Sequence, residues 1–298
     1  MKTEKGQRSQ SMMCIFIAAI IWGTIGIFVD RLSDFGLSSM EIVFLRTLTA
    51  AIALVLYVVF ADRKSLRFHL RDVWIVIGTG VVSFVFFNFC YFTCIKLASL
   101  PVAAELMYSA PVFVVLLSAV LFREKITLQK GAAVLVTVSG CLVLSGIFSQ
   151  QGGVSVAGML IGLATGFLYG LYGIFGQLGI RRGYSSLTIT TYTFIFAAAA
   201  SAFFVNPVHV FQTAAHGEII LWAVAFGVFE TVLPYLIYML GLRHTPASAA
   251  VIIATIEPVV AAVIGFGFFH AELTVSKLIG ILLILSAVLL LNINFKNK

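Results

Sequence analysis

The sequence predicts an all-α membrane protein in which ten transmembrane helices form two inverted five-helix repeats. Three observations support this fold class. Of the 298 residues, 61% are hydrophobic and only 10% are charged, against roughly 25% charged residues in an ordinary soluble domain. The apolar residues fall in ten runs of about spanning length, and the chain matches itself when it is shifted by 147 residues.

The composition excludes the main alternatives to a membrane protein. A soluble globule of this size cannot bury so much apolar surface and still cover itself with polar groups. A disordered chain needs low hydrophobicity and high charge, which is the opposite pattern. A spanning helix takes about 20 residues, so ten spans leave about 100 residues for loops and ends, which is too little for a soluble catalytic domain.

Ten apolar runs bounded by charged residues, Gly, Pro or Asn define the expected spans. Their length favours helices over strands, and the sequence lacks the alternating pattern of a membrane β-barrel. The expected spans are 12–30, 38–60, 73–95, 99–122, 128–148, 155–179, 186–205, 218–241, 246–269 and 275–294.

The basic residues predict the orientation of these spans. Of the 19 Lys and Arg residues, 15 lie on the side of the N-terminus, one (Arg46) lies inside a span, and three lie on the opposite side: Arg31, Lys96 and Lys277. Because cytoplasmic loops carry the excess of Lys and Arg, this split places both termini in the cytoplasm of a multi-pass plasma-membrane protein. The net charge of +7 is therefore a topology signal and does not indicate nucleic-acid binding.

The internal repeat divides the chain into the expected units 12–148 and 155–294. The two units share one register, apart from a two-residue slip where Pro101 meets Pro246. Five spans per unit is an odd number, so the second unit enters the membrane from the other side. Two inverted but similar halves can exchange conformations and open a central site to each side in turn, which favours a transporter. Matching pairs at this shift include Gly23 with Gly170, Gly36 with Gly183, Ser38 with Ser185, Gly80 with Gly227, Tyr91 with Tyr238, and Pro111 with Pro258.

Several segments resemble a known family. The run from Ala110-Pro111 to Arg123-Glu124-Lys125 resembles the fourth-span signature of EamA-type proteins in the drug/metabolite transporter superfamily, and Ile256-Glu257-Pro258 with the later Glu272 resembles its second copy. The pairs Trp22-Gly23 and Leu45-Arg46 and the segment His244-Thr245-Pro246-Ala247 also fit. The resemblance implies an exporter of amino acids, other metabolites or toxic compounds, with a central cavity lined by spans one, three, four, six, eight and nine. Glu272 departs by one residue from the strict repeat of Glu124.

Two acidic residues within spans are candidates for binding substrate or a proton. Glu257 lies about midway along the ninth span beside the helix-breaking Pro258, and Glu230 lies near the middle of the eighth span. A carboxylate at this depth is costly unless it is paired, hydrated or used by the site. Pro234 and Tyr238 follow Glu230 at helical spacing, so an α-helix would place all three on one face. The alternative for both acids is structural: Glu257 would cap backbone donors at the break, and Glu230 would bond to a neighbouring helix.

A second group of candidates lies in the remaining spans. Glu105 and Arg46 have similar expected depth, which permits an ion pair that holds the fold or a gate; direct substrate contact by Glu105 and a water-exposed placement are the alternatives. Asn88, Tyr91 and Tyr108 suit a site for amphipathic solutes, with ordinary packing as the alternative. Pro111 is the helix-breaking counterpart of Pro258.

The leading hypothesis is a secondary transporter that exports small metabolites by alternating access. The alternative is an uncoupled facilitative carrier or channel, and proton coupling, import and the oligomeric state are left open. An enzyme is disfavoured because all four aspartates lie at or beyond span ends, where they form no intramembrane cluster. The sequence shows no H-x-x-x-H pair and no Gly-Lys-Ser/Thr phosphate loop, so we expect neither a metal nor a cofactor. The expected partners are a small-molecule substrate and the lipid bilayer.

Overall fold

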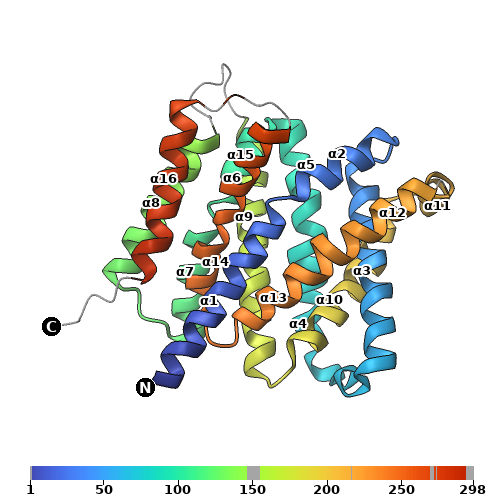
Figure 1. Cartoon of the computed structure of the whole chain (residues 1–298), viewed down its shortest axis with the longest axis horizontal. Coiled ribbons are helices and arrows are strands. Elements are labelled where there is room, and N and C mark those ends of the chain that lie inside the picture. The colour runs from blue at the N-terminus through green and yellow to red at the C-terminus, as the bar shows by residue number, and fades with distance from the viewer. Residues whose placement is uncertain (1, 146–154, 216, 269–271, 273, 293–298) are drawn as a thin grey trace.

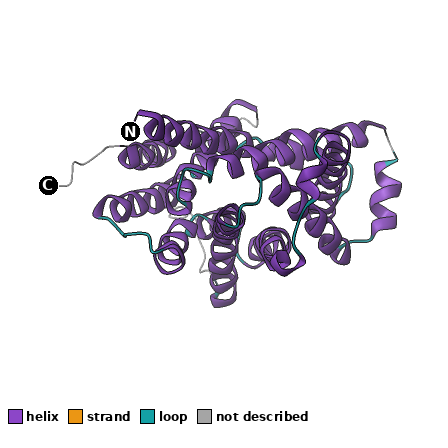
Figure 2. Ribbon diagram, turned by 90° about the horizontal axis from the view of Figure 1, so that it is seen from below, coloured by secondary structure: helices purple, strands orange, loops and turns teal. Residues whose placement is uncertain are grey.

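In the computed structural model, the regular structure of the described residues is helical throughout, and no strand occurs among them (Figure 2). The structure describes residues 2–145, 155–215, 217–268, 272 and 274–292. Within these residues, eight helical segments are long and apolar enough to cross a membrane. Two shorter apolar helices, Leu128–Leu144 and Val275–Leu291, lie where the fifth and tenth spans are expected. The expected span and repeat ends at 148, 269 and 294 lie outside the described residues.

The first half contains kinked as well as continuous helices. Its elements are α1 (Lys2–Trp22), α2 (Ile25–Asp34), α3 (Ser39–Ala61), the short 3₁₀ helices η1 (Arg63–Leu66) and η2 (Leu70–Asp72), α4 (Val73–Ile77), the π-helix η3 (Gly78–Phe86), α5 (Phe87–Leu97), α6 (Leu100–Met107), α7 (Ala110–Phe122) and α8 (Leu128–Ser145).

The second half has a similar order of elements. These are α9 (Val156–Arg181), α10 (Ser186–Ser201), the 3₁₀ helix η5 (Ala202–Phe204), α11 (Pro207–Ala214), α12 (Gly217–Ala225), the π-helix η6 (Phe226–Val232), α13 (Leu233–Gly241), α14 (Ala247–Ala254), α15 (Ile256–Phe268) and α16 (Val275–Asn292).

Helix boundaries follow the 147-residue shift seen in the sequence. Shifted by this amount, α6 takes the bounds of α14 and α8 takes those of α16. The two π-helices, η3 and η6, also overlap under the same shift. Gly36 and Gly183 stand in the left-handed region, at φ 83° and 88°, just before the helices that Ser38 and Ser185 cap. The slip expected between Pro101 and Pro246 does not displace these helix bounds.

Three spans are interrupted near their middle, and the interruptions share one chemistry. The breaks separate α1 from α2, α6 from α7, and α14 from α15. At each break a hydroxyl donates to the carbonyl oxygen three residues earlier, which also accepts the backbone N–H of the same residue. These bonds are Thr24 to Ile21 (2.7 Å), Ser109 to Leu106 (2.6 Å) and Thr255 to Ile252 (2.6 Å). Pro111 and Pro258 follow the second and third breaks, where a missing N–H is tolerated.

The halves pack against each other through their second and third spans. Gly80 in η3 lies against the backbone of Thr193 in α10, and its counterpart Gly227 in η6 lies against Thr49 in α3. Small residues at these contacts allow the helices to approach closely. The pair α8 and α16 forms a separate antiparallel arm (Figure 1): Gln129 donates to the carbonyl oxygen of Leu290 at one end, and Leu144 meets Gly280 at the other. Glycine at the close contacts therefore holds both the centre and the arm together.

Candidate functional site

A cavity of about 840 Å³ lies between the halves. Its wall includes Asp30 and Ser33 near the end of α2, Lys96 near the end of α5, and Lys277 at the start of α16. These helix ends gather at the upper end of the molecule in Figure 1. Among the described residues, the loops that follow α3, α7, α9 and α13 contribute nothing to the wall, and those loops lie at the opposite end. The cavity thus opens toward one end of the bundle.

The cavity wall carries many aromatic side chains, and two pairs of them stand at equivalent positions of the two halves. Under the 147-residue shift, Trp22 corresponds to Tyr169 and Tyr91 corresponds to Tyr238, and all four line the cavity. The rings also contact one another: the Trp22 and Tyr238 centroids are 5.3 Å apart. Aromatic rings with polar tips favour a solute that has an apolar body and a few polar groups.

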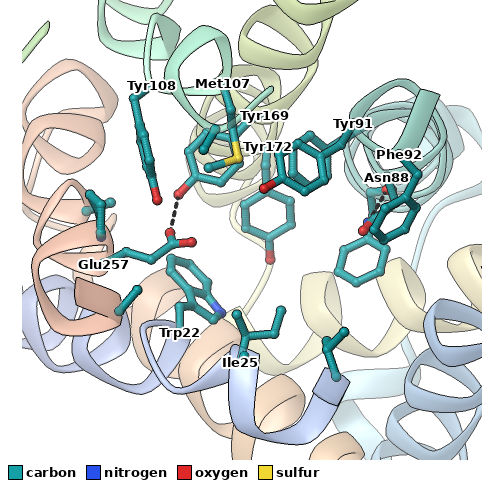
Figure 3. A pocket seen from close by; sticks show the side chains of 18 of the residues that line it. Trp22, Ile25, Asn88, Tyr91, Phe92, Met107, Tyr108, Tyr169, Tyr172 and Glu257 are labelled. Atoms are coloured by element: carbon teal, nitrogen blue, oxygen red, sulfur yellow. Dashed lines mark hydrogen bonds between the residues drawn. The ribbon is translucent and has the colours of Figure 1, made fainter. Parts of the chain in front are cut away.

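Glu257 supplies a carboxylate to this aromatic wall. It lies in the first turn of α15, directly after the break at Thr255. The hydroxyl of Tyr169, in α9, donates a 3.0 Å hydrogen bond to its Oε2. In Figure 3 the hydroxyl of Tyr108 is also directed toward this carboxylate, and the ring of Trp22 lies beside it. The N-terminus of a helix favours negative charge by about 0.3–1 kcal/mol, which offsets part of the cost of placing the charge here.

The counterpart of Glu257 carries no charge. The equivalent position in the first half, at the start of α7, is Ala110, which is fully buried. Gly170 of α9 lies beside this alanine: a β-carbon at Gly170 would stand 3.5 Å from the Ala110 carbonyl oxygen. The frame of the cavity is therefore duplicated, whereas the carboxylate at this position is present in the second half only.

Arg46 and Glu230 form a buried ion pair next to the cavity. The Nη2 atom of Arg46 lies 3.6 Å from Oε2 of Glu230, and the side chains are 5% and 0% exposed. The rings of Phe84 and Phe226 lie 5.0 and 4.7 Å from the guanidinium carbon, which adds a cation–π contribution. Neither oxygen of Glu230 has a hydrogen-bond partner among the described residues. Arg46 is thus the group that compensates the Glu230 charge.

The structure divides the candidate site residues into two sets. Those that line the cavity are Glu257, Pro258, Tyr91, Asn88, Tyr108, Tyr238 and Arg46. Those that lie outside its wall are Glu230, Glu105, Pro111 and Pro234.

Two expectations about this site differ from the structure. Arg46 pairs with Glu230 in the second half instead of Glu105, because the close packing of α3 on η6 brings them together. Glu230 and Tyr238 do not share the cavity face that α-helical spacing predicts. Residues Phe226–Val232 are π-helical, and the wider i→i+5 turn rotates Glu230 away from the face on which α13 places Tyr238. Asn88 lines the cavity while its amide donates to the Phe84 carbonyl oxygen at 2.8 Å.

Contacts between the halves close the end opposite the cavity mouth. Asp72 forms an ion pair with Arg182 and accepts a 2.7 Å hydrogen bond from Tyr184. Burial and this hydrogen bond raise the pKa of the Tyr184 hydroxyl. The hydroxyl oxygens of Ser65 and Ser185 are 3.3 Å apart. These polar contacts link η1 and η2 of the first half to the loop between α9 and α10 of the second half.

Other contacts at the closed end involve Glu124. Its carboxylate accepts hydrogen bonds from Lys130, at 2.8 Å, and from Ser248 at the start of α14. Glu124 therefore joins the end of α7 to the second half of the chain.

The sequence gives no signal for the partner of Glu257. Tyr169 lies 88 residues away along the chain, and its spacing from Glu257 matches no motif. Trp22, Tyr172 and Tyr235 are recognisable as polar-tipped aromatic residues in spans, but only their packing shows that they line one cavity. Within the described part of the chain, no cluster of His, Cys, Asp and Glu could hold a metal ion.

Comparison with known proteins gives consistent matches. The profile of the EamA-like transporter family matches residues 10–146 and 156–293. An "Uncharacterized transporter" of Archaeoglobus fulgidus is 27% identical, covering 93% of this chain and 94% of its own. The "Uncharacterized transporter YxxF" of Bacillus subtilis is 26% identical over 98% and 92% of the two chains, and the "Uncharacterized inner membrane transporter YicL" of Salmonella typhimurium is 22% identical over 98% of each.

A solved structure titled "Crystal structure of protein" shares the fold, with a TM-score of 0.77 at 21% identity over 95% of this chain and 96% of its own. The family profile covers most of the chain in two copies, and transporters are a non-enzymatic class, in agreement with the sequence. The chain is therefore a multi-pass membrane transporter that belongs to the EamA-like transporter family.

Proposed function

We propose that the chain is a secondary transporter of the plasma membrane that exports small solutes by alternating access around the central cavity. The observation that carries this proposal is a cavity with a carboxylate in its wall, open toward one end of the bundle and closed at the other by contacts between the halves. Closure at one end favours a carrier over a channel, because a channel needs a continuous path. The interrupted spans supply backbone groups for a solute near the membrane centre.

The proposed architecture is two inverted five-helix repeats with both termini in the cytoplasm. The shared helix bounds and the antiparallel contact of α8 with α16 support the inversion. The excess of Lys and Arg at the closed end supports the orientation. In this orientation the cavity of the present conformation opens to the outside.

Thiol labelling tests the orientation. Single cysteines are introduced as Ser33→Cys in the cavity wall and Lys64→Cys at the closed end, both exposed positions, after replacement of the four native cysteines. We expect a membrane-impermeant maleimide to label the first variant in intact cells and the second only after permeabilisation. The reverse pattern would show that the cavity opens to the cytoplasm and that the proposed direction is wrong.

Transport in proteoliposomes tests the role of the carboxylate. A mixed metabolite pool is offered, and the solutes that cross are identified by mass spectrometry. We expect Glu257→Gln, which keeps the shape but removes the charge, to lower the transport rate by more than tenfold. Glu218→Gln removes an exposed carboxylate in α12 and should leave the rate unchanged.

The same measurement separates the possible roles of Glu257. Retained binding with loss of the pH dependence of transport would indicate proton coupling, whereas loss of binding would indicate direct substrate contact. Wild-type rate and pH dependence in a folded Glu257→Gln protein would make the carboxylate structural and contradict the proposal. Glu230→Gln should act on folding more than on transport, because Glu230 lies behind the wall.

A further inference from the structure

We infer that the cavity selects an organic amine: a solute whose ammonium group binds Glu257 and whose apolar, preferably aromatic, body rests on the surrounding rings. This inference rests on the proposed transport function and names the substrate class that the same cavity would carry. It follows from the charges in the wall, the geometry at Glu257 and the unpartnered donors of the rings.

The charges deep in the cavity do not balance. The charge of Arg46 is compensated within the protein by Glu230, at 3.6 Å, and by two aromatic rings, while its buried Nε has no hydrogen-bond partner among the described residues. Glu257 has no ion-pair partner among the described residues, and Tyr169 is a neutral donor. Asp30, Lys96 and Lys277 also line the cavity, but Asp30 and Lys96 are exposed at the mouth, and Lys277 donates to the carbonyl oxygen of Glu272 at 2.7 Å. The inner part of the cavity therefore has one uncompensated negative charge, which favours a cationic ligand over an anionic one.

The geometry leaves one oxygen of Glu257 for a ligand. The Tyr169 bond occupies Oε2, and no hydrogen bond from the described residues reaches Oε1. Glu257 is only partly buried and lies in the cavity wall. An ammonium donor at Oε1 would form a charge-assisted hydrogen bond, which is stronger than a neutral one.

The rings around Glu257 suit the body of such a ligand. Trp22, Tyr108 and Tyr169 surround the carboxylate in Figure 3, and Tyr91 and Tyr172 face the same space. Aromatic faces attract an ammonium group within about 6 Å of the ring centre and also pack against an aromatic body. Trp22 Nε1 and the Tyr172 hydroxyl are buried without a hydrogen-bond partner among the described residues. They are neutral donors, so they also suit a neutral acceptor such as a hydroxyl oxygen on the ligand, but neither supplies the positive charge that would balance a carboxylate.

Calorimetric titration of the full-length protein in lipid nanodiscs tests the inference with four small probes. Phenethylamine is the cation, 2-phenylethanol is its neutral analogue, phenylacetate is the anion, and L-phenylalanine is the zwitterion. We expect phenethylamine to bind at least tenfold more tightly than each of the other three. 2-Phenylethanol and phenylacetate lack an ammonium group, and L-phenylalanine adds a carboxylate, whose charge Arg46 does not balance because it is paired with Glu230. Equal affinities, or tighter binding of L-phenylalanine or phenylacetate, would overturn the inference.

Three variants test the contribution of the carboxylate and of the hydroxyl that holds it. Glu257→Gln should weaken phenethylamine at least tenfold and leave 2-phenylethanol unchanged, whereas Glu218→Gln should change neither. Tyr169→Phe, which removes only the hydroxyl that holds the carboxylate, should give a smaller loss, and thermal unfolding checks that each variant is folded. If Glu257→Gln binds phenethylamine as wild type does, the inference fails.

Binding and transport are scored separately in this design. Selective amine binding without movement across proteoliposomes would uphold the ligand class and contradict the transport function. Transport of other solutes without amine selectivity would do the opposite.

Discussion

Oxidation of a protein that carries Ser65→Cys and Ser185→Cys, with the four native cysteines replaced, should abolish transport. The two hydroxyl oxygens are 3.3 Å apart in this conformation and belong to different halves of the chain. Small side-chain rotations would bring two sulfur atoms to the bonding distance of about 2.05 Å. A covalent link here prevents the closed end from separating, so a solute bound in the cavity has no route to the other side.

The matched control for this link is Ser185→Cys with Thr188→Cys. These hydroxyl oxygens are 2.8 Å apart, but both residues lie at the start of α10. A disulfide between them therefore does not link the first half of the chain to the second. We expect reduction to restore transport in the first variant and oxidation to leave the second nearly unaffected. Undiminished transport by a fully cross-linked protein would show that this end does not open, and alternating access between these halves would be wrong.

Replacement of Arg46 by Met should destabilise the fold by about 3–5 kcal/mol, the usual cost of leaving one partner of a buried ion pair uncompensated. Glu230 is fully buried and has no hydrogen-bond partner among the described residues, so Arg46 is what stabilises its charge. The free energy of unfolding can be followed by denaturant titration in mixed micelles.

Two further variants complete this measurement. Arg31→Met removes a cation from a pair with Glu218 in which the side chains are 44% and 53% exposed, and such pairs contribute only about 0–1 kcal/mol. The double variant Arg46→Met with Glu230→Leu should recover most of the lost stability, since an apolar pair of similar volume often replaces a buried ion pair without loss. If Arg46→Met costs no more than Arg31→Met, the pair is not a stabilising element.

The sequence predicts most of the fold because length, hydropathy and the repeat are properties of the whole chain. Eight expected spans overlap described helices long enough to cross a membrane, and the other two overlap shorter apolar helices. The 147-residue shift reappears in helix bounds such as those of α6 and α14. The breaks beside Pro111 and Pro258 can also be predicted from the sequence, because proline removes a backbone hydrogen-bond donor. The break at Thr24 has no proline; it lies beside Gly23, where the chain approaches α15 so closely that a β-carbon would stand 2.5 Å from that of Val260.

The site is less predictable because its geometry depends on local winding and on contacts between the halves. The π-helix at Phe226–Val232 has no signature in the sequence, and it places Glu230 behind the cavity wall instead of on it. The partner of Arg46 follows from helix packing across the halves, which depth along a span does not determine. The position of Glu257 within a span is enough to make it a candidate. Its hydrogen bond to Tyr169 can be found only from the tertiary structure.

A carboxylate at only one of two equivalent positions makes the two states of the proposed cycle unequal. If the halves exchange conformations, the position of Glu257 comes to resemble the one that Ala110 has now, which is fully buried and closely packed. A position packed around an alanine side chain leaves little room for the Glu257 side chain together with a bound solute. One state would thus bind the solute more tightly than the other, so two copies of one architecture that differ at this residue would present two faces of unequal affinity.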